Sequence, residues 1–210
     1  MKRVILLAMG VALAGCAAQA PVPSDRFYRF ADPEPSAARR EAPLIEHLAV
    51  EELRGNGLYA ERPLVYSTDE GRRRLEQYHY DYWLEAPPRL LQGHLIAYFR
   101  GAGLASQVSR PEAGPAEQAV VGGYIDCFEK HMATAPRVVV CLELHLKRPG
   151  DDGPLLARRY DASVSVDGEG MEADLKAYEE ALDQVLAAFL GDISRIEGKV
   201  GGPDGLTAAE

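Results

Sequence analysis

The chain has 210 residues, of which 47% are hydrophobic, and 23 Lys and Arg stand against 32 Asp and Glu, a formal net charge of −9 at pH 7. This acidic balance argues against nucleic acid as a partner and against electrostatic adhesion to an anionic lipid surface, because both need clustered Lys and Arg. The length fits one domain with a sizeable hydrophobic core.

The first sixteen residues have the parts of a secretory signal. Lys2 and Arg3 form a basic start, an apolar run covers 4–14, and Leu-Ala-Gly precedes Cys16. The run is shorter than the roughly 20 residues that a membrane-spanning helix needs. The segment resembles a bacterial lipobox, which predicts a lipoprotein signal peptide over 1–15, with Cys16 diacylated as the mature N-terminus. The alternative is an ordinary exported protein in which a cysteine lies near the cleavage site by chance.

Segments of loop composition flank the expected globular domain. Residues 16–25 are small and proline-containing, which predicts a flexible tether. Residues 27–30 suit a short opening strand. Residues 197–210 contain much glycine without apolar periodicity, which is typical of a disordered tail. One domain is therefore expected over 26–196, in which a further loop at 31–42 follows the opening strand.

The first half of this domain predicts strands followed by a helix. Apolar alternation indicates strands over 44–53, 62–67 and 75–83, with turns at 55–57 and 68–71 between them. Two prolines at Pro87 and Pro88 suit the first turn of a helix, because their missing N–H groups would be unpaired there anyway. Apolar residues then recur at helical spacing until the glycines at 101 and 103.

The second half predicts three strands and a longer helix. The strands cover 118–130, 137–147 and 154–166, and the helix covers 171–196. The order of elements predicts an α+β fold with a mainly antiparallel sheet and two amphipathic helices packed on one of its faces. The helical spacing directs one set of side chains to the sheet: Leu175, Tyr178, Leu182, Val185, Leu186, Phe189 and Ile193.

Cys127 and Cys141 lie on successive expected strands. If the hairpin between them pairs residues whose numbers sum to 268, Cys127 faces Cys141 and Lys130 faces Val138. Directly opposed residues have Cα atoms about 4.5–5.5 Å apart, within the range that a disulfide spans. An exported protein would meet the oxidising conditions that permit the bond. The alternative is two free buried cysteines with the register off by one or two residues.

Motifs for catalysis, metal binding or a cofactor are missing from the sequence. None of the five histidines belongs to a His-Glu-x-x-His motif, and neither a Gly-x-Ser-x-Gly elbow nor a glycine-rich phosphate loop is present. His79 and Asp81 share one face of the expected strand, and a solvated sheet face explains them better than an acid–base or metal pair. The glycines at 122–123 are better explained by a β-bulge than by a phosphate site. We therefore expect no catalytic residue, no metal site and no cofactor.

The aromatic stretch 78–83 (Tyr-His-Tyr-Asp-Tyr-Trp) is the strongest remaining feature. Half of it should cover the core, since alternate residues of a strand face opposite sides. Tyr and Trp are enriched at protein interfaces. We therefore take Tyr80, Tyr82 and Trp83 as candidate partner-binding residues.

Two stretches resemble the auxiliary lipoproteins of ABC-type transport systems. They are 57–67 (Gly-Leu-Tyr-Ala-Glu-Arg-Pro-Leu-Val-Tyr-Ser) and 78–91, which leads from the aromatic strand through the two prolines into the first helix. The resemblance implies an adaptor, not an enzyme, in a system that moves lipids or other apolar molecules between the inner and outer membranes. Its implied partners are a periplasmic substrate-binding protein of the mammalian-cell-entry (MCE) type and the associated permease and ATPase.

The lipoprotein resemblance also implies a location. Position 17 is Ala, not the aspartate associated with inner-membrane retention in enteric lipoproteins, which favours an outer-membrane anchor facing the periplasm. A homo-oligomer is compatible with the sequence. One rival hypothesis is an envelope-assembly lipoprotein that binds lipopolysaccharide or an outer-membrane barrel protein. A second rival is a lipid-anchored hydrolase.

Overall fold

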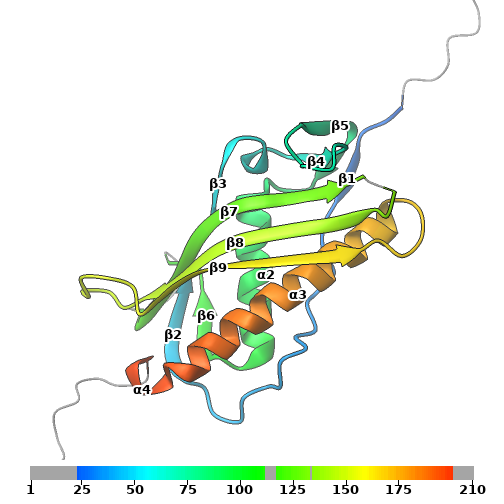
Figure 1. The fold of residues 1–210 in the computed structure, drawn as a ribbon. Coiled ribbons are helices and arrows are strands. Elements are labelled where there is room, and N and C mark those ends of the chain that lie inside the picture. The colour runs from blue at the N-terminus through cyan, green and yellow to red at the C-terminus, as the bar shows by residue number, and fades with distance from the viewer. Residues whose placement is uncertain (1–22, 112–116, 133, 201–210) are drawn as a thin grey trace, which may run out of the picture.

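The computed structural model describes residues 23–111, 117–132 and 134–200. Its nine strands form one curled sheet, against which the long helices α2 and α3 pack (Figure 1). The elements in chain order are β1 Arg26–Tyr28, β2 Ile45–Val50, β3 Arg54–Gly55, the 3-10 helix η2 Gly57–Ala60, β4 Pro63–Ser67, β5 Leu75–Trp83, α2 Pro87–Ala102, β6 Ala105–Ser109, β7 Ala119–His131, β8 Arg137–Lys147, β9 Leu156–Ser165, α3 Met171–Arg195 and α4 Glu197–Val200.

Strand β7 is the centre of the sheet. On one side it pairs along its length with β8, which pairs with β9, and both pairs are antiparallel. On its other side it pairs in turn with β2, β3 and β4, all parallel to it. Two outer pairs, β1 with β5 and β2 with β6, are parallel as well. The α+β class is confirmed, but the sheet is mixed, and the expected mainly antiparallel sheet is wrong.

The sequence could not predict the parallel strand pairs, for a simple physical reason. Alternation along a strand shows which side chains face the core, but it carries no information on the direction of the neighbouring strand. Strands β2, β3 and β4 pair one after another with successive parts of β7 and run parallel to it, like one interrupted strand. The expected strand at 44–53 ends earlier, with β2 at Val50. The short strand β3 at Arg54–Gly55 and the strand β6 were not predicted.

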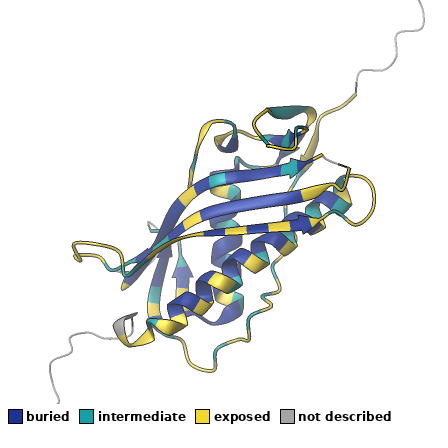
Figure 2. Ribbon diagram, in the orientation of Figure 1, coloured by how far each residue is buried: buried dark blue, intermediate teal, exposed yellow. Residues whose placement is uncertain are grey.

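Both long helices form where the apolar spacing predicts them. Helix α2 starts at the two prolines and ends at Gly103, whose φ of 68° is the left-handed conformation that glycine adopts without strain. Helix α3 covers 171–195 and buries Leu182, Leu186, Phe189 and Ile193. The two helices share one hydrophobic core with the sheet, as the buried stripes of Figure 2 show.

A cluster of aromatic rings fills the core at the end of the sheet near β1. Trp83 packs against Phe128 of β7 and Tyr178 of α3, with ring centroids 5.3 and 5.2 Å apart. Phe30, which follows β1, closes this cluster at 5.1 Å from Trp83. The cluster therefore joins the segment after β1 and helix α3 to strands β5 and β7.

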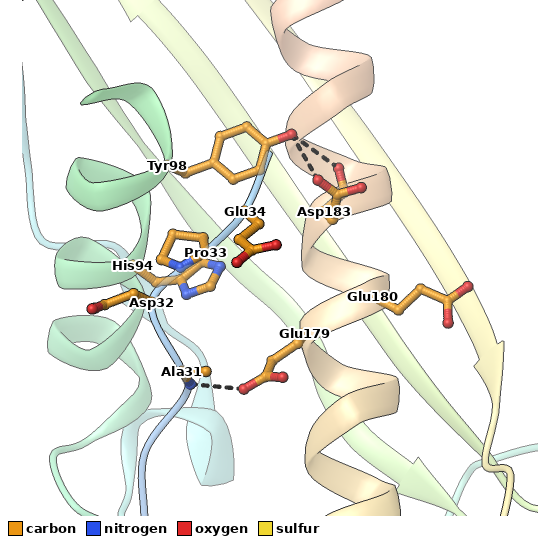
Figure 3. A pocket seen from close by; sticks show the side chains of 9 residues that line it. All are labelled: Ala31, Asp32, Pro33, Glu34, His94, Tyr98, Glu179, Glu180 and Asp183. Carbon is orange, nitrogen blue, oxygen red and sulfur yellow. Dashed lines mark hydrogen bonds between the residues drawn. The ribbon is translucent and has the colours of Figure 1, made fainter. Parts of the chain in front are cut away.

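Residues 30–40, here called the strap, cross both helices. The backbone N–H of Ala31 donates to Glu179 at 2.7 Å (Figure 3). The backbone N–H of Ser36 donates to Asp183 at 2.9 Å, so two points of the strap bind α3. The last strap residue donates its backbone N–H to the final carbonyl of α2 at 3.0 Å. The strap has the irregular backbone expected of a loop, but it is bound to the helices along its length.

The expected signal peptide over 1–15 and most of the expected tether over 16–25 lie outside the described residues. The segment expected as a tail begins with α4, and Glu197 pairs with Arg40 of the strap at 2.6 Å. Residues 201–210 again lie outside the described part. Within the described residues, no helix is long and apolar enough to cross a membrane.

Candidate partner-binding site

Strand β5 carries a bulge in the middle of the aromatic stretch. Its register with β4 changes from Pro63 opposite Tyr82 to Val65 opposite Gln77, so five steps along β5 match two steps along β4. The Tyr82 hydroxyl donates to the carbonyl of His79 at 2.7 Å and closes the bulge. His79 and the residue after it are exposed. Bulges redirect side chains and end regular pairing, and they occur often near functional sites.

The bulge decides where the three predicted partner-binding residues lie. Tyr80 is 36% exposed, whereas Tyr82 is half-buried against Phe27, with ring centroids 5.6 Å apart. Trp83 is 1% exposed and belongs to the core cluster. The prediction that Trp83 binds a partner is therefore wrong, because its face of the strand is the face that packs on α3 and β7.

Two further exposed apolar side chains lie beside these tyrosines. Phe27 is 51% exposed and Leu84 is 48% exposed. The backbone N–H of Leu84 donates to the residue after Phe27 at 2.7 Å, which places both at the β1–β5 edge. Arg62 stacks over the Phe27 ring at 5.0 Å. We call Phe27, Arg62, Tyr80, Tyr82 and Leu84 the β1–β5 patch.

The composition of this patch is that of an interface. Exposed aromatic rings with a stacked arginine are enriched where proteins bind one another. Single exposed apolar residues are ordinary, whereas a group of them at one sheet edge indicates an interaction surface. Sequence reasoning missed Phe27 and Leu84, although Phe27 alternates with Tyr28 in the short opening strand and so had to face away from it.

Asp81 holds β1 against the bulged strand. Its carboxylate accepts hydrogen bonds from the Arg26 guanidinium and the Tyr28 hydroxyl, both at 2.9 Å. Burial and the bond to Asp81 raise the pKa of Tyr28, and the same carboxylate raises the pKa of Arg26. Asp81 is 4% exposed, so the expectation that it lies with His79 on a solvated face is wrong for Asp81. Only the bulge lets these two neighbouring positions differ in this way.

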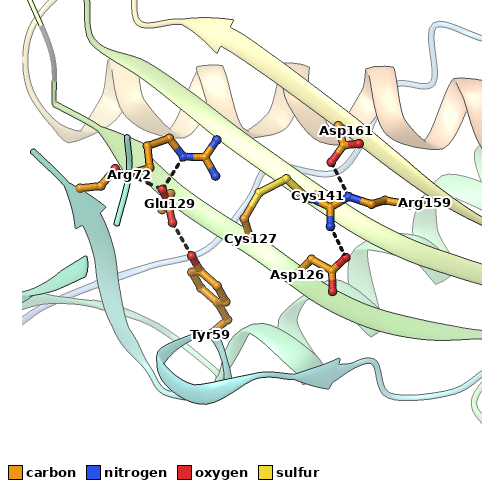
Figure 4. Close-up of a disulfide and its surroundings, with 9 residues drawn as sticks. Tyr59, Arg72, Asp126, Cys127, Glu129, Cys141, Arg159 and Asp161 are labelled. Carbon is orange, nitrogen blue, oxygen red and sulfur yellow. Dashed lines mark hydrogen bonds and ion pairs between the residues drawn. A yellow bond between two sulfur atoms is a disulfide. The ribbon is translucent and has the colours of Figure 1, made fainter. Parts of the chain in front are cut away.

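A buried polar cluster joins β4, η2 and β7. Glu129 accepts hydrogen bonds from Tyr59, from Ser67 at 3.1 Å and from Arg72 at 2.9 Å (Figure 4). Ser67 also lies 3.2 Å from Nδ1 of His131. A catalytic triad would need an accessible Ser67 and a carboxylate that orients the His131 ring. Here Ser67 is fully buried, and the Glu129 carboxylate binds the Ser67 hydroxyl instead. The cluster is a satisfied structural junction.

Cys127 and Cys141 lie opposite one another on β7 and β8, with the register that sums to 268. A disulfide joins them across a Cα separation of 4.8 Å. Arg159 of β9 flanks the bond and bridges Asp126 at 2.8 Å and Asp161 at 2.9 Å (Figure 4). The irregularity in β7 falls between Ile125 and Cys127, and not at the two glycines where a bulge was expected; these pair regularly with β8.

The structure offers little for metal chemistry. Among the described residues, no group of three or more His, Cys, Asp or Glu is arranged to hold a metal ion. Cys16, the expected lipidation site, lies outside the described part of the chain.

Comparisons with known proteins give a family and a fold. The model of the ABC-type transport auxiliary lipoprotein component family matches residues 28–189. Protein XCC0632 from Xanthomonas campestris, of the DUF330 family, is 18% identical, with a TM-score of 0.66 over 83% of this chain and 97% of that one. A second solved structure, of an uncharacterized protein, is 15% identical, with a TM-score of 0.63 over 81% and 98%. No curated protein matches the chain.

Proposed function

The chain belongs to the family of ABC-type transport auxiliary lipoprotein components, and from this membership we propose that it is a lipid-anchored periplasmic adaptor. In this proposal it serves a system that moves lipids or other apolar molecules between the inner and outer membranes. Its partner is the MCE-type substrate-binding protein, which works with a permease and an ATPase. The adaptor binds and positions this partner and catalyses nothing itself.

The β1–β5 patch is the single observation that carries the proposed docking role. It combines two strongly exposed apolar side chains, two tyrosines and a stacked arginine. The Asp81 contacts hold the short strand β1 in place, so the patch is preformed. A preformed surface loses little conformational entropy on binding, which favours its use as a docking site.

The patch also lies next to the proposed anchor. Arg26, the first residue of β1, comes ten positions after Cys16. The flexible tether of this proposal would have an r.m.s. span of about 16–19 Å and would reach at most about 35 Å. An acylated Cys16 would therefore hold the β1–β5 patch close to the outer membrane, where a partner that crosses the periplasm has to arrive.

Site-specific photocrosslinking in intact cells tests this docking surface. A photoreactive amino acid at position 80 should crosslink to the MCE protein. The matched control is position 124 on β7, since Tyr80 and Tyr124 are each 36% exposed. Equal crosslinking from both positions, or none from position 80, would contradict docking at the patch.

Co-purification tests the function more broadly. The double variant Phe27→Asp, Leu84→Asp should lose the MCE protein, because two buried charges would replace the apolar contacts. Met132→Asp changes another exposed apolar residue outside the patch and should retain it. Recovery of a barrel protein or lipopolysaccharide in place of the MCE protein would replace the proposal with the envelope-assembly function.

A further inference from the structure

A pocket of about 360 Å³ opens on the helix side of the domain, between the strap, α2 and α3 (Figure 3). Helix α2 contributes His94 and Tyr98 to it. Carboxylates from the strap and α3 supply the rest of its polar lining: Asp32, Glu34, Glu179, Glu180 and Asp183. Among the described residues that line the pocket, none is Lys or Arg, so its carboxylates are not neutralised from within.

The hydrogen bonds of the strap use only part of this acceptor capacity. Glu179 accepts from the strap through Oε1, and Asp183 accepts from Ser36 and from Tyr98 through Oδ1. The second oxygen of each carboxylate has no hydrogen bond within the described residues. Glu179 and Asp183 are four residues apart on α3, so their charges recur along the pocket about 6 Å apart.

His94 gives an independent indication of a ligand. It is 7% exposed, lines the pocket and has no hydrogen-bond partner in the described part of the chain. Unlike the enclosed and unpaired hydroxyl of Tyr178, the ring nitrogens of His94 open to the pocket, so a ligand with an N–H group can reach them. Burial lowers the pKa of His94 to about 4 despite the nearby Asp183. The imidazole is therefore neutral at pH 7 and offers one nitrogen as an acceptor.

We propose that this pocket binds a small linear polyamine, whose ammonium groups pair with the spaced carboxylates while one N–H donates to His94. A linear polyamine separates its charges by alkyl chains and so matches a pocket in which carboxylates recur along a helix. A ligand that carries phosphate is disfavoured, because five carboxylates would repel it. This site does not depend on the proposed docking function and lies on other elements than the β1–β5 patch.

Calorimetric titration of the purified full chain in a neutral detergent tests the site, with spermidine as the probe. The variant Glu34→Gln, Glu179→Gln keeps an acceptor for the strap but removes two charges, and it should bind spermidine at least about tenfold more weakly. The control Glu46→Gln, Glu143→Gln makes the same change in net charge on β2 and β8, and it should bind like the unmodified protein. Equal weakening in both variants would show a diffuse charge effect and overturn the proposal.

Three further measurements separate a built site from general attraction to an acidic protein. Magnesium at equal charge should not displace spermidine, and phosphoethanolamine should not bind; displacement by magnesium or comparable binding of phosphoethanolamine would contradict the proposal. In the unmodified protein with ¹³C-labelled histidine, spermidine should shift the NMR signal of His94 and leave that of His79, which is exposed on β5, unchanged. An unmoved His94 signal at saturating spermidine would also overturn the site.

Discussion

Tyr80 and Trp83 are three residues apart on β5, and they have opposite environments. The first is exposed at the bulge, and the second is enclosed by Phe128 and Tyr178. Both are aromatic, so their composition alone assigns them equally to a core or to an interface. Their contributions to stability should therefore differ, although only three positions separate them along the strand.

Replacing these two residues by alanine should separate the two roles. Trp83→Ala should lower the free energy of unfolding by about 3–5 kcal/mol, because it leaves a cavity in the aromatic cluster. Tyr80→Ala should change it by no more than about 0.5 kcal/mol, as expected for an exposed position. Urea unfolding of the full chain in detergent measures both values. Similar losses in the two variants would contradict the assignment.

His94 should make the stability of the domain depend on pH. Its pKa in the folded state is about 4, below the ordinary value of 6.5, so between these pH values the unfolded chain binds more protons than the folded one. The contribution of neutral His94 is therefore fully present above about pH 6.5 and is lost as the pH falls toward 4. Between pH 7 and pH 4.5 the loss should be about 2–3 kcal/mol.

The comparison with His94→Leu isolates this effect from the titration of carboxylates. The variant should lose less stability than the unmodified protein between pH 7 and pH 4.5 in urea unfolding. If the two proteins lose the same amount, His94 is not held neutral by the fold.

At the scale of elements, the β7–β8 hairpin organises the sheet. Strand β7 pairs with β8 on one side and with three separate strands on the other. The disulfide lies near the middle of this hairpin, between a strand bulge and the pair Val140 and Phe128. A covalent link at this point restricts the unfolded chain and holds the strand on which most of the sheet depends.

Removing the disulfide should therefore destabilise the domain. Cys127→Ala, Cys141→Ala should lower the free energy of unfolding by about 2–4 kcal/mol, since the bond closes a loop with a sequence separation of 14. Reductant should lower the stability of the unmodified protein by a similar amount and leave the double variant unchanged. Alkylation of both cysteines without reductant would instead show free thiols.

At the scale of the whole molecule, the N-terminal segment connects the proposed anchor to the body of the domain. Strand β1 pairs with β5, Phe30 enters the core and the strap binds α2 and α3. The described residues nearest the proposed anchor are therefore bound to the sheet and to both helices.

Cys16→Ser should release the protein from the membrane without unfolding it. The variant should appear in the soluble periplasmic fraction, since the proposed acyl chains would supply the attachment at about 0.8 kcal/mol per buried methylene group. Fractionation with metabolic labelling by a fatty acid measures this, and Cys127→Ala, Cys141→Ala is the control that should remain labelled. A Cys16→Ser protein that stays labelled and membrane-bound would contradict the anchor.

Much of the secondary structure could be predicted from the sequence because helical spacing and strand alternation are local properties. The two long helices, the strands β5, β7, β8 and β9, and the opposition of Cys127 and Cys141 all follow from residues close to one another in the chain. The family resemblance likewise depends on short stretches, and the family match over 28–189 confirms it.

Only the tertiary structure decided the direction of the strands beside β7, the face of Trp83 and the meeting of the strap with α3. Each of these depends on contacts between residues far apart in sequence. The Phe27 ring packs on Tyr82, the Ala31 N–H donates to Glu179, and β2 pairs in parallel with β7. A local pattern shows that a side chain is apolar or charged. Which distant segment covers it is set by the packing of the whole core, and this packing placed the exposed patch at the β1–β5 edge and the acidic pocket under the strap.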